Sequence, residues 1–387
     1  MRVLYLTDSL SDLDGVGRYA LELIRALERL EPSLGVSVLL ARDHRPSSAD
    51  VPARWRVEVA LPPDWFFRMG RLRFWASYAA AVRRVRRAAR GVDLVHAIKD
   101  YPHNLVGLAG ARRAGVPCVA TGHGTYTVQP LLTTRHAARA RWAYRRFAAL
   151  ILVSRFTARR VREILGPEEA ARVRLEVIPN AVDAGRYLAP SAIGARPWHA
   201  HPFTLSIGEL KERKGHHLAL AGWCRVAAAH PELHHYVVGK RSGDAYQRSL
   251  EALVEGAGLA ARVHWLGNVS EEEKVDLLQR ARVFLHTPVV SSDGGFEGFG
   301  IVYLEAAAAG TPSIGTLGSG AEDAIEEGTS GLLVPPEPAA VETALRALLE
   351  DETRRAAMGR SARERAQSIT WEDNARRVLA IYREVLA

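Results

Sequence analysis

The residues best suited to chemistry lie at 295–312, where two glutamates stand eight residues apart across a glycine-rich turn. Gly295, Gly298 and Gly300 let the backbone pass close to a ligand, and 301–309 contains good helix formers. A helix that begins near Gly300 presents unpaired amides and the positive end of its dipole, which suits a phosphate. The turn is therefore predicted to bind an anion.

The two glutamates, Glu297 and Glu305, are predicted to lie on either side of that anion. Glu297 is in the loop beside it, and Glu305 is one to two turns along the helix. A diphosphate with a sugar on each side fits this arrangement. A strand-to-helix loop with two surface glutamates is the alternative from these residues alone.

Basic residues cluster at 206–215, after a predicted strand and before a predicted helix. We predict that Lys214 contacts the phosphate, because a charge-assisted contact is worth roughly 1.5–3 kcal/mol. Either Lys211 or Arg213 supplies a second positive charge, and Arg213 is favoured. A surface lysine at a helix start is the alternative for Lys214.

A second glycine loop, Gly15-Val16-Gly17, opens the first predicted helix and satisfies the dinucleotide fingerprint G-x-G-x-x-A. A nicotinamide- or flavin-dependent oxidoreductase is therefore one alternative function. The spacing argues against it, because seven residues separate the strand end from Gly15 where that fingerprint requires a tight turn.

His123 directly follows a predicted strand and lies between Gly122 and Gly124, which let it face a cleft at the carboxyl ends of the strands. A buried histidine with satisfied hydrogen bonds is the alternative. No metal site is predicted, since the acidic residues are scattered. Asp12-Leu13-Asp14 is interpreted as a chance Asp-x-Asp because it precedes a helix.

Short apolar runs alternate with segments of helical period, which indicates parallel sheets covered on both faces. Strands are predicted at 3–7, 36–40, 94–97, 118–121, 150–153 and 175–178, and again at 203–207, 236–238, 263–266, 283–286 and 313–314. Helices are predicted at 16–30 and 105–114, and from residues 215, 246, 271, 301 and 339. The sequence therefore predicts two Rossmann-like α/β domains, at 1–183 and 203–370. A proline- and glycine-rich linker at 184–202 joins them, and an amphipathic helix at 371–387 comes after the second domain.

Composition fits a folded protein of 387 residues, with 48% hydrophobic and 25% charged residues. Cys118 and Cys224 match no disulfide or metal spacing, which predicts reduced thiols and a cytoplasmic location. The first apolar run is five residues long and meets Asp8, so it predicts a buried strand rather than a signal peptide. No run is long enough for a membrane span.

The net charge of +9 is concentrated at 68–90 and 135–160, each with eight arginines among aromatic residues. Such helices attract anionic lipid head groups or other phosphates, so attachment to the inner membrane face is one interpretation. A solvated arginine-rich helix face is the other. Nucleic acid is not expected as a partner, because no recognisable binding module is present.

The segment 295–312 resembles the Glu-x7-Glu donor-sugar motif of the retaining family-four glycosyltransferases, which have the GT-B fold. The segments 310–314, 326–335 and 177–183 resemble further parts of that family's pattern. The resemblance covers nearly the whole chain and is weakest at 42–90. Two departures stand out: Glu209 replaces a usual arginine, and Ala181 replaces a usual glycine.

The resemblance implies two Rossmann-like domains that face each other across a cleft, with the C-terminal helix crossing back to pack on the first. It assigns Glu305 to the ribose, Glu297 to the donor sugar, and the amides of Gly298, Phe299, Gly300 and Ile301 to sugar and phosphate. It places Gly15, Val16 and Gly17 by the donor phosphate and the acceptor.

His123 is implied to orient the donor sugar, since in retaining members the leaving phosphate is thought to take the acceptor's proton. The predicted function is a retaining, metal-independent hexosyltransferase with no cofactor. It uses a nucleotide-diphosphate sugar and a hydroxyl acceptor: a glycan, a lipid-linked or a phosphate-bearing molecule. A catalytically silent nucleotide-sugar-binding protein is a further alternative, supported by Glu209.

Overall fold

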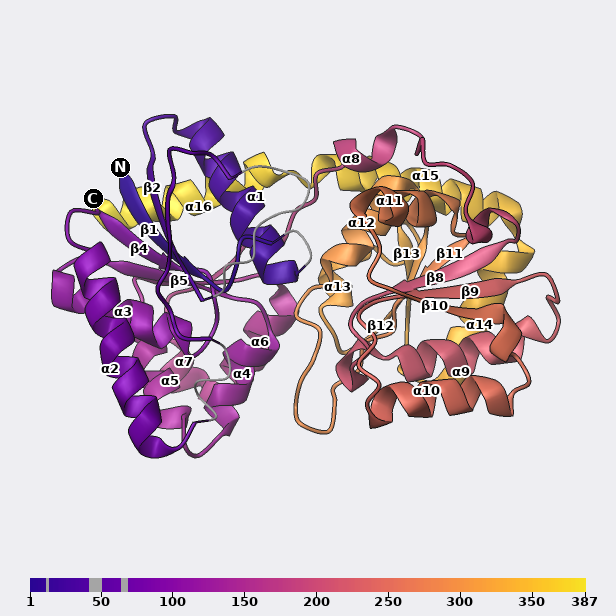
Figure 1. The fold of residues 1–387 in the computed structure, drawn as a ribbon, viewed down its shortest axis with the longest axis horizontal. Helices are drawn as coiled ribbons and strands as arrows, with labels where there is room; N and C mark the ends of the chain where they lie inside the picture. Colours follow the sequence, from indigo (N-terminus) through magenta and orange to yellow (C-terminus); the bar gives the residue numbers. More distant parts are fainter. Residues whose placement is uncertain (12–13, 42–50, 64–68) are drawn as a thin grey trace. The chain divides into compact units, whose positions relative to one another are not determined.

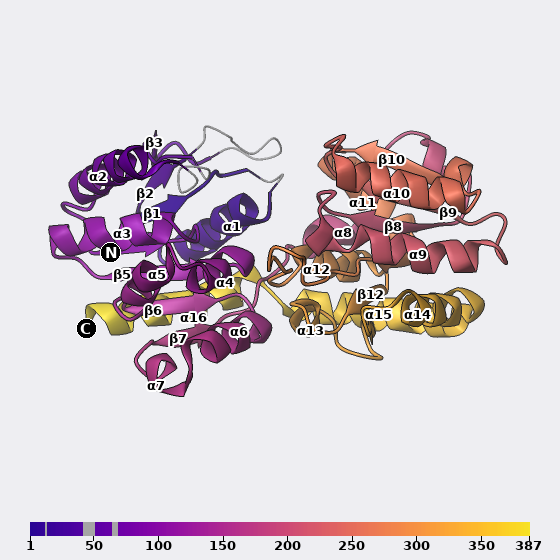
Figure 2. The ribbon, with the colours of Figure 1, turned by 90° about the horizontal axis from the view of Figure 1, so that it is seen from below.

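The computed structural model describes residues 1–11, 14–41, 51–63 and 69–387, which form two compact units. The first unit comprises Met1–Asn180 together with Trp371–Ala387, and the second comprises Ala181–Thr370. Each unit is a parallel sheet with helices on both faces (Figure 1, Figure 2).

The first unit contains a seven-stranded sheet in the order β3-β2-β1-β4-β5-β6-β7. Its strands are β1 Arg2–Thr7, β2 Gly35–Leu40, β3 Arg56–Val59, β4 Leu94–Ala97, β5 Cys118–Gly122, β6 Ala149–Leu152 and β7 Leu175–Val177. The chain moves outward from β1 to β3 and returns on the other side of β1 as β4. Ligands of open parallel sheets bind beyond the carboxyl ends of the strands at such a switch point.

Helices cover both faces of this sheet. They are α1 Gly15–Leu30, α2 Arg71–Ala88, α3 His103–Ala114, α4 Thr125–Leu132, α5 Ala137–Tyr144, α6 Arg155–Leu165, α7 Pro167–Ala170 and α16 Trp371–Leu386. Figure 1 shows α1 and α16 together on one face, with α2, α3 and α5 on the other. The C-terminal helix is joined to the sheet by Tyr382, whose hydroxyl lies 2.6 Å from His96 Nδ1.

The second unit repeats the same plan with six parallel strands in the order β10-β9-β8-β11-β12-β13. They are β8 Phe203–Ile207, β9 His234–Val238, β10 Val263–Gly267, β11 Val283–Leu285, β12 Ser313–Thr316 and β13 Gly331–Val334. Here the order reverses between β8 and β11, so the residues that follow these two strands lie at the switch point.

The helices of the second unit also form two layers. They are α8 Gly185–Leu188, α9 His216–Ala227, α10 Ala245–Gly256, α11 Glu271–Arg280, α12 Ile301–Ala309, α13 Ala321–Ala324, α14 Pro338–Glu350 and α15 Glu352–Ser368. Helices α9, α10 and α14 pack together, as do α8, α11, α12 and α15 (Figure 1). Short 3₁₀ turns at Pro197–His199, Glu212–Lys214 and Ala260–Arg262 complete the unit.

The prediction of two α/β halves is confirmed. Every predicted strand is present to within two residues, while β3 and β13 were not predicted. The segment 184–202, expected to be the connection between the domains, belongs to the second unit. Its Trp198 Nε1 donates a hydrogen bond of 2.6 Å to Asp276 Oδ2, which explains why this proline-rich stretch is ordered.

In the part of the chain that the structure describes, no helix combines the length and apolar character needed to cross a bilayer.

Candidate functional site

The switch point of the second unit is formed by Gly208, directly after β8, and His286, directly after β11. A methyl group on Gly208 would lie 3.6 Å from Lys214 Cδ and 3.7 Å from His286 Cε1. The absence of a side chain at position 208 therefore leaves space beside a lysine and a histidine at the carboxyl edge of the sheet.

Glu297 is the centre of this cluster. Its carboxylate accepts a hydrogen bond from Lys214 Nζ, and the same oxygen, Oε2, lies 3.5 Å from His286 Nε2 and 3.9 Å from Arg213 Nη1. Glu297 is only 8% exposed. The structure thus brings together three of the residues predicted for the site, Lys214, Arg213 and Glu297, and adds a histidine that the sequence did not assign.

Burial and charge act against each other at this carboxylate. Burial raises the pKa of Glu297, but Lys214, His286 and Arg213 together lower it well below its usual value. Burial lowers the pKa of Lys214, and Glu297 partly offsets that effect. Burial likewise lowers the pKa of His286. At neutral pH the cluster therefore holds an ionised carboxylate against cationic groups, with a neutral imidazole beside it.

The backbone around Lys214 is fixed by Gly215, which has a φ of +69°. A side chain there would place its Cβ 1.7 Å from the carbonyl oxygen of Thr287, so only glycine fits. The Thr287 hydroxyl in turn donates to the Gly215 carbonyl at 2.9 Å, and Val289 N donates to the Arg213 carbonyl at 3.1 Å. These contacts join the Lys214 turn to the loop that leads to Glu297.

Gly320 fixes the other side of the Glu297 loop. Its amide donates to the Glu297 carbonyl at 2.9 Å, and a Cβ at this position would lie 2.3 Å from the carbonyl of Gly298. The loop then passes into α12, whose N-cap residue Gly300 has a φ of +84° and provides no side-chain cap. Position 300 therefore supplies no side-chain acceptor to the amides of the first turn of α12, which present the positive end of a nine-residue helix.

Glu305 lies on the same helix and is 3% exposed. Its Oε1 accepts a hydrogen bond of 3.0 Å from Lys274 Nζ of α11, and Lys274 also lies 3.2 Å from Glu271. The structure therefore holds Glu305 in place through a buried lysine, on the helix whose first turn follows Glu297.

In the first unit, His123 follows β5 and is partly buried. Its backbone N–H donates to Asp100 Oδ1 at 3.1 Å, its Nε2 lies 2.9 Å from the carbonyl oxygen of Ile98, and its ring meets Tyr19 edge-on with centroids 4.9 Å apart. Burial lowers its pKa, although Asp100 raises it. Since a carbonyl only accepts, Nε2 carries the proton, and Nδ1 of the neutral ring is an acceptor.

The glycine loop at the start of α1 is held by local contacts. Asp14 caps the helix, accepting from the Gly17 amide at 2.7 Å. A Cβ on Gly17 would lie 2.6 Å from the Ser11 carbonyl oxygen. Gly15 is exposed and Val16 half-buried. The Asp14 carboxylate thus already accepts from the Gly17 amide, which the phosphate of a dinucleotide would need. Asp12 and Leu13 lie outside the described residues.

Comparison with known proteins identifies the family of this chain. Residues 13–186 match the family model described as Glycosyltransferase Family 4, and residues 197–365 match the model described as Glycosyl transferases group 1. A glycogen synthase of Mycobacterium tuberculosis is 30% identical over 298 residues, which are 75% of this chain and 68% of that protein. The chain belongs to the family-four glycosyltransferases.

Solved structures agree on the GT-B fold of this family. The Anabaena protein HepE, in complex with UDP-glucose, gives a TM-score of 0.76 at 21% identity, covering 98% of this chain and 99% of that one. Sucrose-phosphate synthase from Thermosynechococcus elongatus gives 0.79, also at 21% identity, covering 99% of this chain and 98% of that one. At such identities the likeness shows the fold alone.

The match to another curated relative is shorter. A D-inositol 3-phosphate glycosyltransferase of Corynebacterium urealyticum is 35% identical over 184 residues, which are 46% of this chain. The match spans only 42% of the length of that relative.

The chain departs from its family's pattern at Glu209, and the structure shows what this residue contacts. Its Oε2 lies 2.9 Å from Lys211 Nζ and 3.6 Å from Arg213 Nη2. Arg213 therefore lies between Glu209 and Glu297, whereas Lys211 is paired with Glu209 and exposed. Burial raises the pKa of Glu209, but Lys211 and then Arg213 lower it below its usual value.

Sequence reasoning missed His286 and Lys274 as members of the site. His286 stands at a strand end, but only the strand order shows that this end is the switch point. Lys274 is one of several charged residues on α11, and the approach of α12 alone reveals its partner. The described residues contain no group of three or more potential ligands able to hold a metal ion.

Proposed function

We propose that this chain transfers a glycosyl group from a nucleotide-diphosphate sugar to a hydroxyl acceptor, with retention of the anomeric configuration and without a metal ion. The observation that carries the proposal is the buried Glu297 carboxylate, held by Lys214 with Arg213 and His286 at the switch point, directly before the uncapped start of α12.

The diphosphate is assigned to the first turn of α12 and to Lys214. Lys211, Arg213 and Lys214 provide three cationic groups at this loop, partly offset by Glu209, Glu297 and Asp293, and a diphosphate would exchange with these carboxylates for charge-assisted hydrogen bonds. When a phosphate binds, Lys214 exchanges part of its contact with Glu297 for a phosphate oxygen. Arg213 is proposed as the second cation because it already lies near Glu297.

The sugar and the nucleoside are assigned to the two carboxylates. Glu297, once Lys214 turns to the phosphate, accepts hydrogen bonds from hydroxyls of the donor sugar. Glu305 accepts from the ribose hydroxyls, held in position by Lys274. Carboxylates suit both roles because each has two oxygens that accept from paired hydroxyls.

For His123 we propose a contact between Nδ1 and a hydroxyl of the bound donor. Because Nε2 is committed to the Ile98 carbonyl and burial lowers the ring's pKa, His123 is a neutral acceptor that orients the sugar. In a retaining transfer the departing phosphate oxygen takes the acceptor's proton on the same face. His123→Ala is therefore expected to lower kcat by more than it changes KM.

The acceptor is proposed to be a glycan, a lipid-linked molecule or a phosphate-bearing molecule. Relatives carry the names glycogen synthase, D-inositol 3-phosphate glycosyltransferase and phosphatidyl-myo-inositol mannosyltransferase, which span these classes. A cytoplasmic location is proposed on the two unpaired cysteines, of which Cys118 is buried.

A panel of nucleotide sugars, screened by thermal stabilisation, tests the donor. A ligand at one hundred times its Kd stabilises the folded state by roughly 2.7 kcal/mol. The stabilising donor is then incubated with candidate acceptors in the presence of a chelator. Release of nucleoside diphosphate with an unchanged anomeric configuration in the product supports the proposal. Inversion, or a strict requirement for metal, contradicts it.

Glu209 favours a second candidate, a protein that binds a nucleotide sugar without transferring it. Glu209 places a carboxylate beside Arg213, where the family usually has an arginine, and this weakens the positive field at the phosphate. Slow hydrolysis of the donor with release of nucleoside diphosphate would exclude this candidate. Stabilisation by a donor with no turnover would support it.

A further inference from the structure

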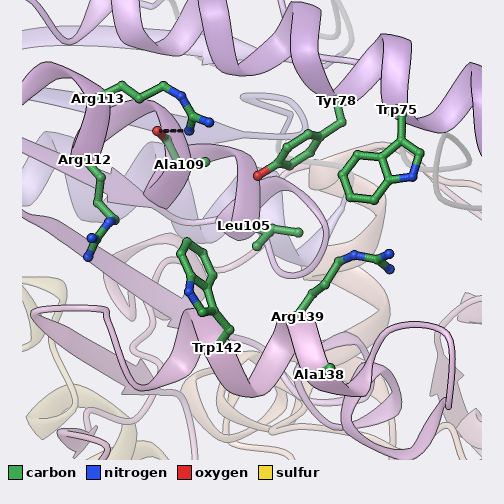
Figure 3. A pocket seen from close by; sticks show the side chains of 9 residues that line it. All are labelled: Trp75, Tyr78, Leu105, Ala109, Arg112, Arg113, Ala138, Arg139 and Trp142. Carbon is green, nitrogen blue, oxygen red and sulfur yellow. Dashed lines mark hydrogen bonds between the residues drawn. The ribbon is translucent and has the colours of Figure 1, made fainter.

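A cavity of about 680 Å³ lies among α2, α3 and α5 of the first unit (Figure 3). Its walls are largely apolar and aromatic. Figure 3 shows Trp75 and Tyr78 from α2 and Trp142 from α5 around Leu105 of α3. Such walls suit the hydrocarbon or ring portion of a ligand.

Three arginines, Arg112, Arg113 and Arg139, line the same cavity. The guanidinium carbon of Arg139 lies 4.7 Å from the centre of the Trp75 ring, and that of Arg112 lies 5.9 Å from the Trp142 ring. Arg113 Nη1 donates to the Ala109 carbonyl at 2.9 Å. Within the described ranges none of the three forms an ion pair with a carboxylate, so their charge is available to an external anion.

The charge extends well beyond the cavity. Helix α2 carries six further exposed arginines, and none of α2, α3 and α5 contains aspartate or glutamate. Beside this charge, at the start of α2, Leu72 is 88% exposed and Trp75 is 44% exposed. An apolar side chain among arginines at a surface is typical of a helix that lies in a lipid head-group layer.

We propose that this face of the first unit docks on an anionic phospholipid membrane. The cavity receives the phosphate of one lipid between its arginines, with the start of the lipid's hydrocarbon against Trp142 and Leu105. Leu72 and Trp75 enter the head-group layer. The proposal is independent of the proposed transferase activity, because none of these residues belongs to the donor site.

Two observations favour a membrane over a soluble phosphate compound. A soluble ligand of the cavity's size would be satisfied by the three arginines that line it, whereas the six arginines of α2, at the two ends of that helix, lie outside the lining. A soluble ligand also gives no role to Leu72, which is not among the residues that line the cavity.

The test is sedimentation of the full chain with vesicles of phosphatidylcholine alone or with about 30% phosphatidylglycerol. Each arginine near an anionic surface is worth about 1 kcal/mol, so Arg112→Gln combined with Arg139→Gln should weaken binding roughly thirty-fold. The matched control, Arg248→Gln combined with Arg354→Gln on exposed positions of α10 and α15, has the same net charge and should bind within about twofold of wild type.

Leu72→Ser provides a second variant that does not threaten folding, because the side chain is almost fully exposed. It should weaken vesicle binding about tenfold without lowering the melting temperature. Equal losses in the control and in the cavity variant would overturn the proposal, as would wild-type binding by Leu72→Ser. If inorganic phosphate or glycerol phosphate binds at the cavity while neither vesicle binds, the site serves a soluble phosphate and the membrane proposal is wrong.

Discussion

Replacing Lys214 by methionine removes one charge from the donor site while keeping a side chain of similar length. In the proposed complex Lys214 donates a charge-assisted hydrogen bond to the diphosphate, worth roughly 1.5–3 kcal/mol. Nucleoside diphosphate affinity should therefore fall about ten- to two-hundred-fold, measured by titration calorimetry with the nucleotide that stabilises the wild type most.

The same change should also lower stability, because it leaves the Glu297 carboxylate buried with less compensation. Breaking a fully buried ion pair costs about 3–5 kcal/mol, and an exposed pair is worth about 1 kcal/mol or less. Arg213 at 3.9 Å and His286 at 3.5 Å remain beside Glu297, so a loss of about 2 kcal/mol is expected. For a domain of this size that corresponds to a melting temperature lower by roughly 4–8 °C.

Two further variants separate binding from stability. Adding Glu297→Gln to Lys214→Met removes the unpaired charge and should recover most of the lost stability without recovering affinity. Lys211→Met is the matched control, since Lys211 is exposed and pairs with Glu209, and it should change affinity by less than about threefold. A Lys214→Met variant that binds within twofold of wild type, or a double variant less stable than either single one, would refute the reasoning.

The remaining predictions concern the ribose contact, the pH response and the backbone. Glu305→Gln should weaken binding of the nucleoside diphosphate about tenfold. It should also abolish the wild type's preference for the ribonucleotide over its 2′-deoxy analogue, and a preserved preference would contradict the ribose role. Because the folded-state pKa of Glu297 is depressed, its stabilisation is fully present above the unfolded value near 4.5 and is lost as pH falls below it. Urea unfolding should show that the free energy of unfolding of Glu297→Gln falls less steeply at acid pH than that of the wild type. Parallel pH profiles of the two proteins would contradict this. Gly215→Ala should cost at least about 3 kcal/mol, since it combines a positive φ with an overlap at the Thr287 carbonyl. Gly256→Ala, at an open position of α10, should change stability by less than about 1 kcal/mol, and similar melting of both variants would show that the overlap relaxes.

The sequence predicts the sheets well because their strands are buried on both faces. Buried strands such as β6 and β11 read as continuous apolar runs, which stand out between helices. Strand β3 lacks this pattern, and β13 shows it only over three residues, 332–334. In β3, Arg56–Val59, three of the four residues are exposed and charged residues alternate with valine, and β13, Gly331–Val334, begins with glycine.

Helix α15 was missed for a different reason: it packs through small residues rather than a stripe of large apolar ones. A Cβ on Gly359 would lie 2.3 Å from the carbonyl oxygen of Gly310, so the close approach depends on glycine and alanine. Sequence periodicity detects large apolar side chains, and a helix of this kind carries little such pattern.

At the site, the sequence predicts residues whose chemistry is local and misses those whose meaning depends on the fold. The approach of Lys214 to Glu297 across 83 residues follows from two loops at one sheet edge, which alternating strands and helices already predict. His286 gains its importance only from the strand order. The packing of 184–202 was also missed, since Trp198 finds its partner Asp276 far along the chain.

The proposed function depends on a nucleoside diphosphate binding at the switch point of the second unit. The most direct measurement is a crystal structure of the chain with the nucleoside diphosphate that stabilises it most. Phosphate oxygens should lie within hydrogen-bond distance of Lys214 Nζ and of the first amides of α12, with the ribose at Glu305. A nucleotide bound elsewhere, or Lys214 still paired only with Glu297 beside an occupied site, would contradict it.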